Sequence, residues 1–283
     1  MLFRSCPPKA AFEAADIEGI ILQVEAPIAN VQIGENNERD KFIEAELRRI
    51  IDTYGNHPSF CLMSLGNEFG GDNNILTKWI DMLMKLDPRH LYSSAACGQN
   101  TDNRQFTVTC DGRGIHGANT NYDLRRAVLR DSRPIIGHEI GQWLFFPDFN
   151  EIQKYNGVMK VDNYEIIREG LKKNGLLAYY DEIYQAVGKH AILLYKEEIE
   201  QMLRTQGYAG FQLLSLQDYP TQGTALIGPL NAFWESKGFI SPEKHRQYCG
   251  QVVPLLRIPK RIYTNNEVFE GLVEISNSRQ SDI

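Results

Sequence analysis

Residues 55–68 read GNHPSFCLMSLGNE, a turn followed by a short apolar run that ends in an amide and a carboxyl group. A run of this length, preceded by a turn and closed by Gly66, is typical of a strand buried in a parallel sheet. A helical pattern follows over residues 75–86 and ends at Asp87 and Pro88. A strand followed by a helix is the unit of α/β folds, so this stretch predicts an α/β protein.

The same alternation of apolar runs and helical patterns continues along the chain. Short apolar runs predict further strands at 20–24, 90–96, 105–110, 133–139 and 210–216. Apolar residues at helical spacing predict helices over 10–17, 39–54, 164–173 and 179–204. This order fits either an open doubly wound sheet or a (β/α)8 barrel that lacks strands, and both place the active site at the carboxyl ends of the strands.

The composition limits the classes of partner. The chain has 283 residues, of which 42% are hydrophobic, and a formal net charge of −6, which disfavours a nucleic acid. No apolar run approaches the roughly 20 residues that a membrane-spanning helix needs, so no membrane partner is expected. The five cysteines include no Cys-x-x-Cys pair, so neither a disulfide framework nor a zinc ribbon is predicted.

Polar side chains follow several of the predicted strands. Those that end or follow an apolar run are Glu25, Asn67, Glu68, Glu139, Gln217 and Asp218. Cleavage of a glycosidic bond requires two facing carboxyl groups, since one protonates the leaving oxygen and the other attacks or assists at the sugar carbon. We therefore expect Glu68 and Glu139 to act together on a carbohydrate.

Other side chains near these positions suit a sugar ligand. The Asn67 amide could bond a sugar hydroxyl, and Trp143 offers a flat apolar face for the C–H side of a pyranose. His116 fits either a sugar contact or an ordinary loop residue.

The residues quoted above resemble a known family. Residues 56–59 running into residues 64–68 resemble the acid/base signature of glycoside hydrolase family 2, the β-galactosidases, β-glucuronidases and β-mannosidases. Residues 133–141 resemble the strand that carries the nucleophile of that family, and residues 210–220 resemble its eighth strand. The resemblance runs in order through roughly residues 3–250.

This resemblance implies a (β/α)8 TIM barrel over residues 1–254, without its first strand or two, and the beginning of a β-sandwich over residues 255–283. It also implies that Glu68 is the general acid/base and Glu139 the nucleophile of a retaining mechanism, with a covalent glycosyl-enzyme intermediate. Asn67 would contact the sugar beside the reaction centre. Gln217 and Asp218 would line the pocket.

Two residues differ from the pattern of the family, and these differences, together with the positions of the two chain ends, limit what the resemblance implies. Ile140 stands where many relatives have tyrosine, and Leu214 stands where several have tryptophan, so the sugar and its linkage stay open. The chain looks like a fragment cut at both ends, beginning near the family's second strand at residues 3–6. An incomplete barrel has unpaired edge strands, which favours association with a second copy. The compartment stays open, a periplasmic or secreted parent being one option.

Three other hypotheses compete with the glycosidase hypothesis. Residues 112–117 fit Gly-x-Gly-x-x-Gly, so a dinucleotide-binding oxidoreductase is one alternative, with Glu139 as its ribose-binding acid. A non-catalytic carbohydrate-binding remnant is another. A zinc site at His138 is not predicted, because Gln142 stands where a second histidine ligand would be needed. We expect no metal at the site and no obligatory redox cofactor.

Overall fold

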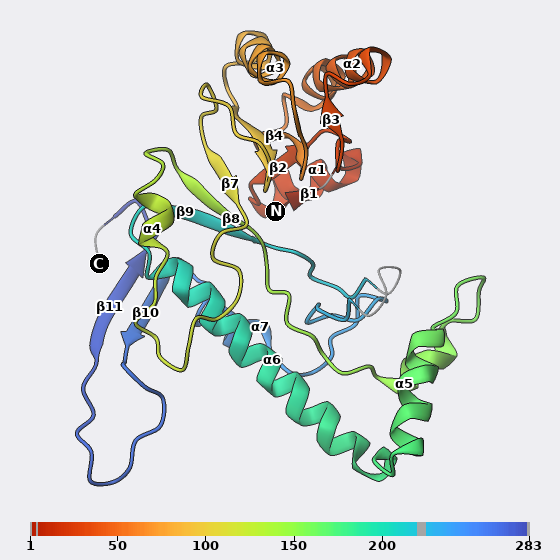
Figure 1. Ribbon diagram of the computed structural model, residues 1–283, viewed down its shortest axis with the longest axis vertical. Helices are drawn as coiled ribbons and strands as arrows, with labels where there is room; N and C mark the ends of the chain where they lie inside the picture. The colour runs from red at the N-terminus through yellow and green to blue at the C-terminus, as the bar shows by residue number, and fades with distance from the viewer. Residues whose placement is uncertain (1, 4, 220–224, 282–283) are drawn as a thin grey trace. The chain divides into compact units, whose positions relative to one another are not determined.

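The computed structural model describes residues 2–3, 5–219 and 225–281 (Figure 1). Two compact units divide the chain. Unit 1 comprises residues 1–113, 124–140 and 205–213, and unit 2 comprises residues 114–123, 141–204 and 214–283. Arg4, in the segment compared with the family's second strand, and Pro220, at the end of the segment compared with its eighth, lie outside the described residues.

Unit 1 is built on parallel strands. One sheet has the order β1-β2-β4-β6, and a second has the order β7-β8-β9. The strands are β1 (Leu2–Phe3), β2 (Leu22–Glu25), β4 (Phe60–Asn67), β6 (Leu91–Ala96), β7 (Thr107–Thr109), β8 (Ile135–Ile140) and β9 (Tyr208–Leu213). In both sheets, neighbouring strands therefore follow one another in chain order.

Hydrogen bonds also connect β6 to β7. The Cys97 amide donates to the Val108 carbonyl at 3.2 Å, and the Gln105 amide donates to the Tyr92 carbonyl at 2.8 Å. These bonds continue the strand order from one sheet to the other. No closed barrel forms among the described residues. The prediction of a parallel α/β architecture is therefore confirmed, and the barrel stays a prediction.

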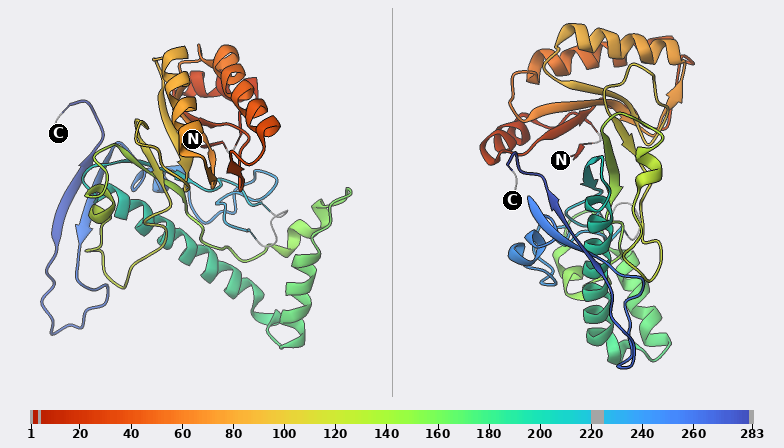
Figure 2. Two further views of the ribbon diagram at one scale, coloured as in Figure 1. Left: turned by 45° about the horizontal axis from the view of Figure 1, so that its top comes forward. Right: turned by 90° about the vertical axis from the view of Figure 1, so that its left-hand side faces the viewer.

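Three helices cover the sheet that begins with β1. They are α1 (Lys9–Glu18), α2 (Asn37–Tyr54) and α3 (Asn73–Leu86), and α2 and α3 lie side by side (Figures 1 and 2). Each helix has an apolar side at helical spacing, represented by Phe12 in α1, Leu47 in α2 and Leu76 in α3, all fully buried with strand residues such as Met63. This core fixes the strands whose ends carry the candidate site.

Capping residues explain where two of these helices begin. The Asn36 side chain accepts a hydrogen bond from the Arg39 amide at the start of α2, and the Asp72 side chain accepts one from the Asn74 amide at the start of α3. At the end of α1, Gly19 takes the left-handed conformation common at helix ends.

A short parallel pair of strands, β3 (Gln32–Ile33) and β5 (Gly70–Gly71), follows the ends of β2 and β4.

Unit 2 is mainly helical and ends in a β-hairpin. It contains η1 (Phe149–Lys154), α5 (Asp162–Lys173), η2 (Leu177–Tyr179), α6 (Tyr180–Leu203) and α7 (Pro242–Arg246). Strands β10 (Val252–Arg257) and β11 (Leu272–Asn277) pair in antiparallel register. The short helix α4 (Arg125–Val128) belongs to unit 1. Strand β11 lies within residues 255–283, where the resemblance implies the beginning of a β-sandwich, and that sandwich stays a prediction.

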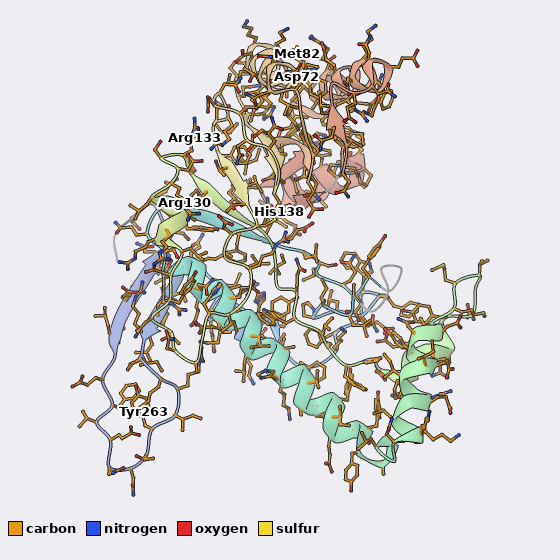
Figure 3. The ribbon with its side chains drawn as sticks, viewed as in Figure 1. Asp72, Met82, Arg130, Arg133, His138 and Tyr263 are labelled. Atoms are coloured by element: carbon orange, nitrogen blue, oxygen red, sulfur yellow. A yellow bond between two sulfur atoms is a disulfide. The ribbon has the colours of Figure 1, made fainter. Side chains whose placement is uncertain are left out.

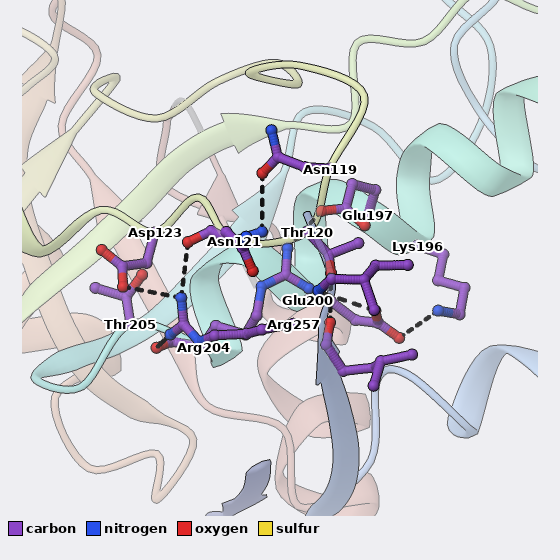
Figure 4. Close-up of polar contacts among 12 residues, drawn as sticks. Asn119, Thr120, Asn121, Asp123, Lys196, Glu197, Glu200, Arg204, Thr205 and Arg257 are labelled. Atoms are coloured by element: carbon purple, nitrogen blue, oxygen red, sulfur yellow. Dashed lines mark hydrogen bonds and ion pairs between the residues drawn. The ribbon is translucent and has the colours of Figure 1, made fainter. Parts of the chain in front are cut away.

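Arg257 connects the hairpin to the rest of unit 2 (Figure 4). Its guanidinium pairs with Asp123 at 3.1 Å and donates to the carbonyls of Asn121 and Arg204, each at 2.9 Å. The Arg257 side chain is 12% exposed. Because a partly buried guanidinium with several oxygen partners is strongly localised, the hairpin is anchored at the end of β10.

Among the described residues, no helix combines the length and the apolar composition needed to cross a membrane.

Candidate functional site

The candidate site lies at the carboxyl ends of the unit 1 strands. Asn67 is the last residue of β4, and His138 lies near the end of β8. The Asn67 Oδ1 and the His138 Nε2 are 3.0 Å apart and hydrogen-bonded, although β4 and β8 are not neighbours in a sheet. Both side chains are buried, and Figure 3 labels His138. The residues that immediately precede Glu68 and Glu139 are therefore in direct contact.

A buried chain of polar side chains extends from this contact. The His138 Nδ1 lies 3.0 Å from the Gln212 Oε1, and the Gln212 amide donates to the Gln23 Oε1 at 2.8 Å. The Gln23 amide in turn donates to the Glu25 Oε1 at 3.2 Å. Hydrogen-bonded chains of this kind fix side-chain positions inside a protein. The structure thus brings Glu25, Asn67 and the strand of Glu139 into one network.

Glu68 is exposed and follows directly after β4. Its φ of 50° is unusual for a residue other than glycine and turns the chain sharply at the strand end. Its amide donates to the Ala96 carbonyl at 2.8 Å, and its carbonyl accepts from the Asn30 amide at 3.2 Å. Both neighbouring segments therefore hold the backbone while the carboxyl group stays accessible.

Close packing explains Gly66, two residues before Glu68. A Cβ atom at this position would lie 2.7 Å from both the Cβ and the carbonyl oxygen of Ile28. Only glycine lets the segment after β2 approach the end of β4 this closely.

Glu139 sits at an irregularity of β8. Gly137 pairs with Phe211 and Ile140 with Leu213, so the register advances three residues on β8 and two on β9. An extra residue of this kind is a β-bulge, which redirects side chains and is common beside functional sites. Glu139 has a φ of 52° and is 2% exposed. In a regular strand, successive side chains point to opposite faces of the sheet. The bulge therefore interrupts this alternation at His138 and Glu139.

The guanidinium of Arg113 pairs with Glu139. Its Nη2 lies 2.8 Å from the Glu139 Oε2, and its Nε donates to the His138 carbonyl at 2.9 Å. The pair is partly shielded, since the Glu139 side chain is 3% exposed and that of Arg113 is 28% exposed. The guanidinium thus neutralises a buried carboxylate that would otherwise be costly to desolvate.

The Asn67 amide nitrogen is a buried donor without a hydrogen-bond partner among the described residues. A buried donor without a partner costs free energy, roughly 1–3 kcal/mol. A ligand hydroxyl that accepted from this nitrogen would remove that cost.

A single disulfide joins two of the strand ends, although the cysteine spacing predicts no disulfide framework. Cys97 follows β6, Cys110 follows β7, and their Cα atoms are 5.3 Å apart. Counting Cys-x-x-Cys pairs missed this bond because the partners meet through neighbouring parallel strands, 13 residues apart in sequence.

Four predicted site residues belong to unit 2. The Trp143 indole donates to the Glu198 carboxylate at 2.7 Å, and the His116 ring stacks on Tyr122 with centroids 4.1 Å apart. Gln217 forms an isolated bridge with Leu230.

Asp218, the fourth predicted site residue of unit 2, is buried and pairs with the Lys237 Nζ at 2.7 Å. Burial raises the pKa of Asp218, and the nearby lysine opposes that shift only in part. Burial likewise lowers the pKa of Lys237 against the influence of Asp218. Asp218 therefore has a protein partner of opposite charge in unit 2.

The glycine motif at residues 112–117 does not have the structure of a dinucleotide site. After β7, the next helix is α4, which has 4 residues and begins only at Arg125. A Rossmann site needs a helix that starts directly at the glycines, so that its N-terminus meets the pyrophosphate. No group of three or more histidine, cysteine, aspartate or glutamate residues able to hold a metal occurs in the described part of the chain.

Comparisons with known proteins identify the class of fold. No protein-family model and no curated protein sequence matches the chain. Solved structures of glycoside hydrolase family 2 enzymes match across most of it.

Three of the matching structures illustrate this likeness. A β-galacturonidase from Eisenbergiella tayi bound to galacturonate has a TM-score of 0.56 at 13% identity, over 84% of this chain and 42% of that one. The β-glucuronidase 3 of Bacteroides uniformis has a TM-score of 0.56 at 14% identity, over 89% and 33%. A β-glucuronidase from Bifidobacterium dentium, complexed with coumarin-3-O-glucuronide, has a TM-score of 0.53 at 18% identity, over 84% and 39%. At this identity the likeness is one of fold, and the chain spans less than half of each structure.

The sequence predicts Glu68 and Glu139 as site residues but does not predict the residues that contact them. The sequence suggests His138 only as a zinc ligand and Arg113 only as part of the glycine motif, and it suggests no role for Gln212. The position of His138 beside Glu139 was the available signal. No sequence signal pointed to Arg113.

Proposed function

We propose that this chain carries the catalytic centre of a retaining glycoside hydrolase that removes a terminal β-linked sugar. The observation that carries the proposal is the hydrogen bond between Asn67 and His138, which joins the two strand ends immediately before Glu68 and Glu139. The fold likeness to glycoside hydrolase family 2 supports it independently. A retaining mechanism requires the two carboxyl groups about 5–5.5 Å apart.

In this mechanism Glu139 is the nucleophile. Its carboxylate attacks the anomeric carbon while the protonated Glu68 donates its proton to the leaving oxygen. The covalent glycosyl-enzyme is then hydrolysed by a water molecule whose proton passes to Glu68. Two inversions at the anomeric carbon give net retention, and Glu68 returns to its protonated form.

The surroundings suit these roles. Glu68 is exposed, as a group that exchanges protons with leaving group and water must be, and Glu139 is enclosed and paired with Arg113. The Asn67 nitrogen, which has no hydrogen-bond partner in the part of the chain that the structure describes, is available to a sugar hydroxyl beside the reacting carbon. Glu25 of unit 1 joins Asn67 as a candidate sugar contact, and His116, Trp143, Gln217 and Asp218 of unit 2 stay predicted sugar contacts.

The substrate class is tested with a panel of p-nitrophenyl β-glycosides. It includes β-glucuronide and β-galacturonide, because structural relatives carry those activities in their names, and the neutral β-galactoside, β-glucoside and β-mannoside. We expect hydrolysis of at least one member. Binding of the sugars without any hydrolysis would instead support a non-catalytic carbohydrate-binding protein.

Glutamine variants at the two glutamates test their roles. Glu139→Gln should lower kcat by about 10⁴-fold or more, because the covalent step is lost. Glu68→Gln should lower it by about 10²–10⁴-fold, the usual contribution of a general acid/base. The matched control is Glu18→Gln, an exposed position at the end of α1, which should leave kcat unchanged.

Rescue by azide separates the two roles. In Glu68→Ala a small anion can attack the glycosyl-enzyme without general-base assistance, so azide should restore turnover and yield a β-glycosyl azide. Equal loss in both glutamine variants without any azide rescue of Glu68→Ala would contradict the assignment of Glu68.

A further inference from the structure

The segment that carries Arg113 is a turn that directly follows β7 in unit 1. Residues 110–113 form a turn in which the Arg113 amide donates to the Cys110 carbonyl at 3.4 Å. Gly112, the third residue of that turn, has a φ of 98°, as type II turns require. A Cβ atom at Gly112 would lie 2.5 Å from the Leu124 side chain. Arg113 is thus held three residues from a half-cystine.

The same half-cystine pair contacts the arginine side chain. Cys110 is bonded to Cys97, and the Arg113 Nη2 lies 3.5 Å from the Cys97 Sγ and 2.8 Å from the Glu139 Oε2. The disulfide therefore fixes the start of the turn, and its other sulfur lies against the guanidinium.

We infer that Arg113 positions Glu139, and that the Cys97–Cys110 disulfide holds Arg113 in place, so that the competence of the site depends on the redox state of this bond. The part of the inference that concerns catalysis rests on the proposed function. Arg113 is a positioning residue: its fork spans the His138 carbonyl and the Glu139 carboxylate, which fixes the carboxylate relative to its own strand.

Reduction removes this restraint. A dithiol transfers two electrons and two protons to the disulfide, giving the Cys97 and Cys110 thiols, while the dithiol is oxidised to a cyclic disulfide. The residue that begins the turn, Cys110, then loses its covalent link to Cys97 at the end of β6. A displacement of the carboxylate by about 1 Å is enough to lower a rate about 100-fold.

The disulfide is tested first by thiol counting. Alkylation and mass spectrometry of the native oxidised protein should find three reactive cysteines, Cys6, Cys61 and Cys249, and five after reduction by dithiothreitol. Five free thiols in air-oxidised protein would overturn the inference.

Activity and hydrogen exchange then test the link to Glu139. Dithiothreitol should lower kcat about 10–100-fold, reversibly, and Cys97→Ser/Cys110→Ser should show the low kcat without responding to dithiothreitol. The matched control replaces Cys6, Cys61 and Cys249 by serine and should keep the full response. Arg113→Ala should resemble the reduced state and regain part of its kcat with added guanidinium, whereas Arg113→Lys should regain little because it lacks the fork.

Hydrogen exchange separates failure of this inference from failure of the proposed function. Reduction should accelerate amide exchange in peptides covering residues 110–114 and 138–141, with no change in α2 and α3. If the wild type hydrolyses no glycoside in either redox state, the proposed function fails while this exchange difference still tests the positioning. Equal exchange in both redox states, or an Arg113→Ala variant with wild-type kcat, would overturn the inference.

Discussion

At the scale of single residues, the contact between Asn67 and His138 explains why the ends of two separated strands lie together. Both ring nitrogens of His138 face amide oxygens, Asn67 Oδ1 on one side and Gln212 Oε1 on the other. The sequence predicted Glu68 and Glu139 because a carboxylate that follows an apolar run can be recognised from the sequence alone. The ring contacts of His138 bring together residues as much as 74 positions apart, so no local pattern could predict them.

Replacing His138 tests this contact. His138→Leu should lower the free energy of unfolding by about 2–4 kcal/mol, because two buried amide oxygens lose their partner. Urea denaturation followed by circular dichroism measures the change. The control is His116→Leu, an exposed position, where we expect a change within about 0.5 kcal/mol. Equal stability of the wild type and His138→Leu would show that the histidine does not bridge the strands.

At the scale of elements, a cluster around Asp131 ties the entry of β8 to β7. The Asp131 carboxylate accepts from the Arg104 Nη2 at 2.6 Å, the Thr107 hydroxyl at 2.5 Å and the Arg133 amide at 3.1 Å. The apolar runs predicted both strands to within a few residues. The cluster was not predicted, because charged residues in loops have no periodic pattern.

The pKa of Asp131 gives a pH-dependent prediction. Burial alone would raise this pKa, but hydrogen bonds from Thr107, Arg133 and Arg104 together outweigh it and lower the pKa below its usual range. A pKa lowered by folding stabilises the protein above the ordinary carboxylate pKa, and this stabilisation is lost as the pH falls below about 4.

Asp131→Asn should therefore destabilise the protein by about 3 kcal/mol at pH 7, with a difference from the wild type that shrinks from pH 5 to pH 2. Urea midpoints across this range provide the measurement. Asp52→Asn, at an exposed position of α2, serves as the control. A difference that stays constant with pH would show that Asp131 is not paired as described.

At the scale of the whole molecule, the chain divides into two units that are not contiguous in sequence. The order of strands and helices, and thus the α/β class, could be predicted, because each element has its own hydrophobic period. The division into two units could not be predicted from the sequence. Residues 114–123 and residues 205–213 each belong to a different unit from their neighbours in sequence. Such exchanges depend on tertiary contacts, which periodicity does not reveal.

The anchoring of the C-terminal hairpin follows from Arg257. Arg257→Ala should lower the stability of unit 2 by about 3 kcal/mol, because Asp123 and two carbonyls lose a buried cation. Limited proteolysis should then release the hairpin faster than from the wild type. Arg279→Ala, at an exposed position in the same region, should change neither property. Unchanged proteolysis of Arg257→Ala would mean that other contacts hold the hairpin.

The central claim is that Glu68 and Glu139 serve one anomeric carbon, and covalent trapping tests it most directly. An activated 2-deoxy-2-fluoro glycoside of the sugar that is hydrolysed should accumulate as a glycosyl-enzyme, and peptide mass spectrometry locates the adduct. We predict one sugar per chain, attached to Glu139, and no adduct in Glu139→Gln. An adduct on any other residue, or none despite turnover of the parent glycoside, would contradict the account.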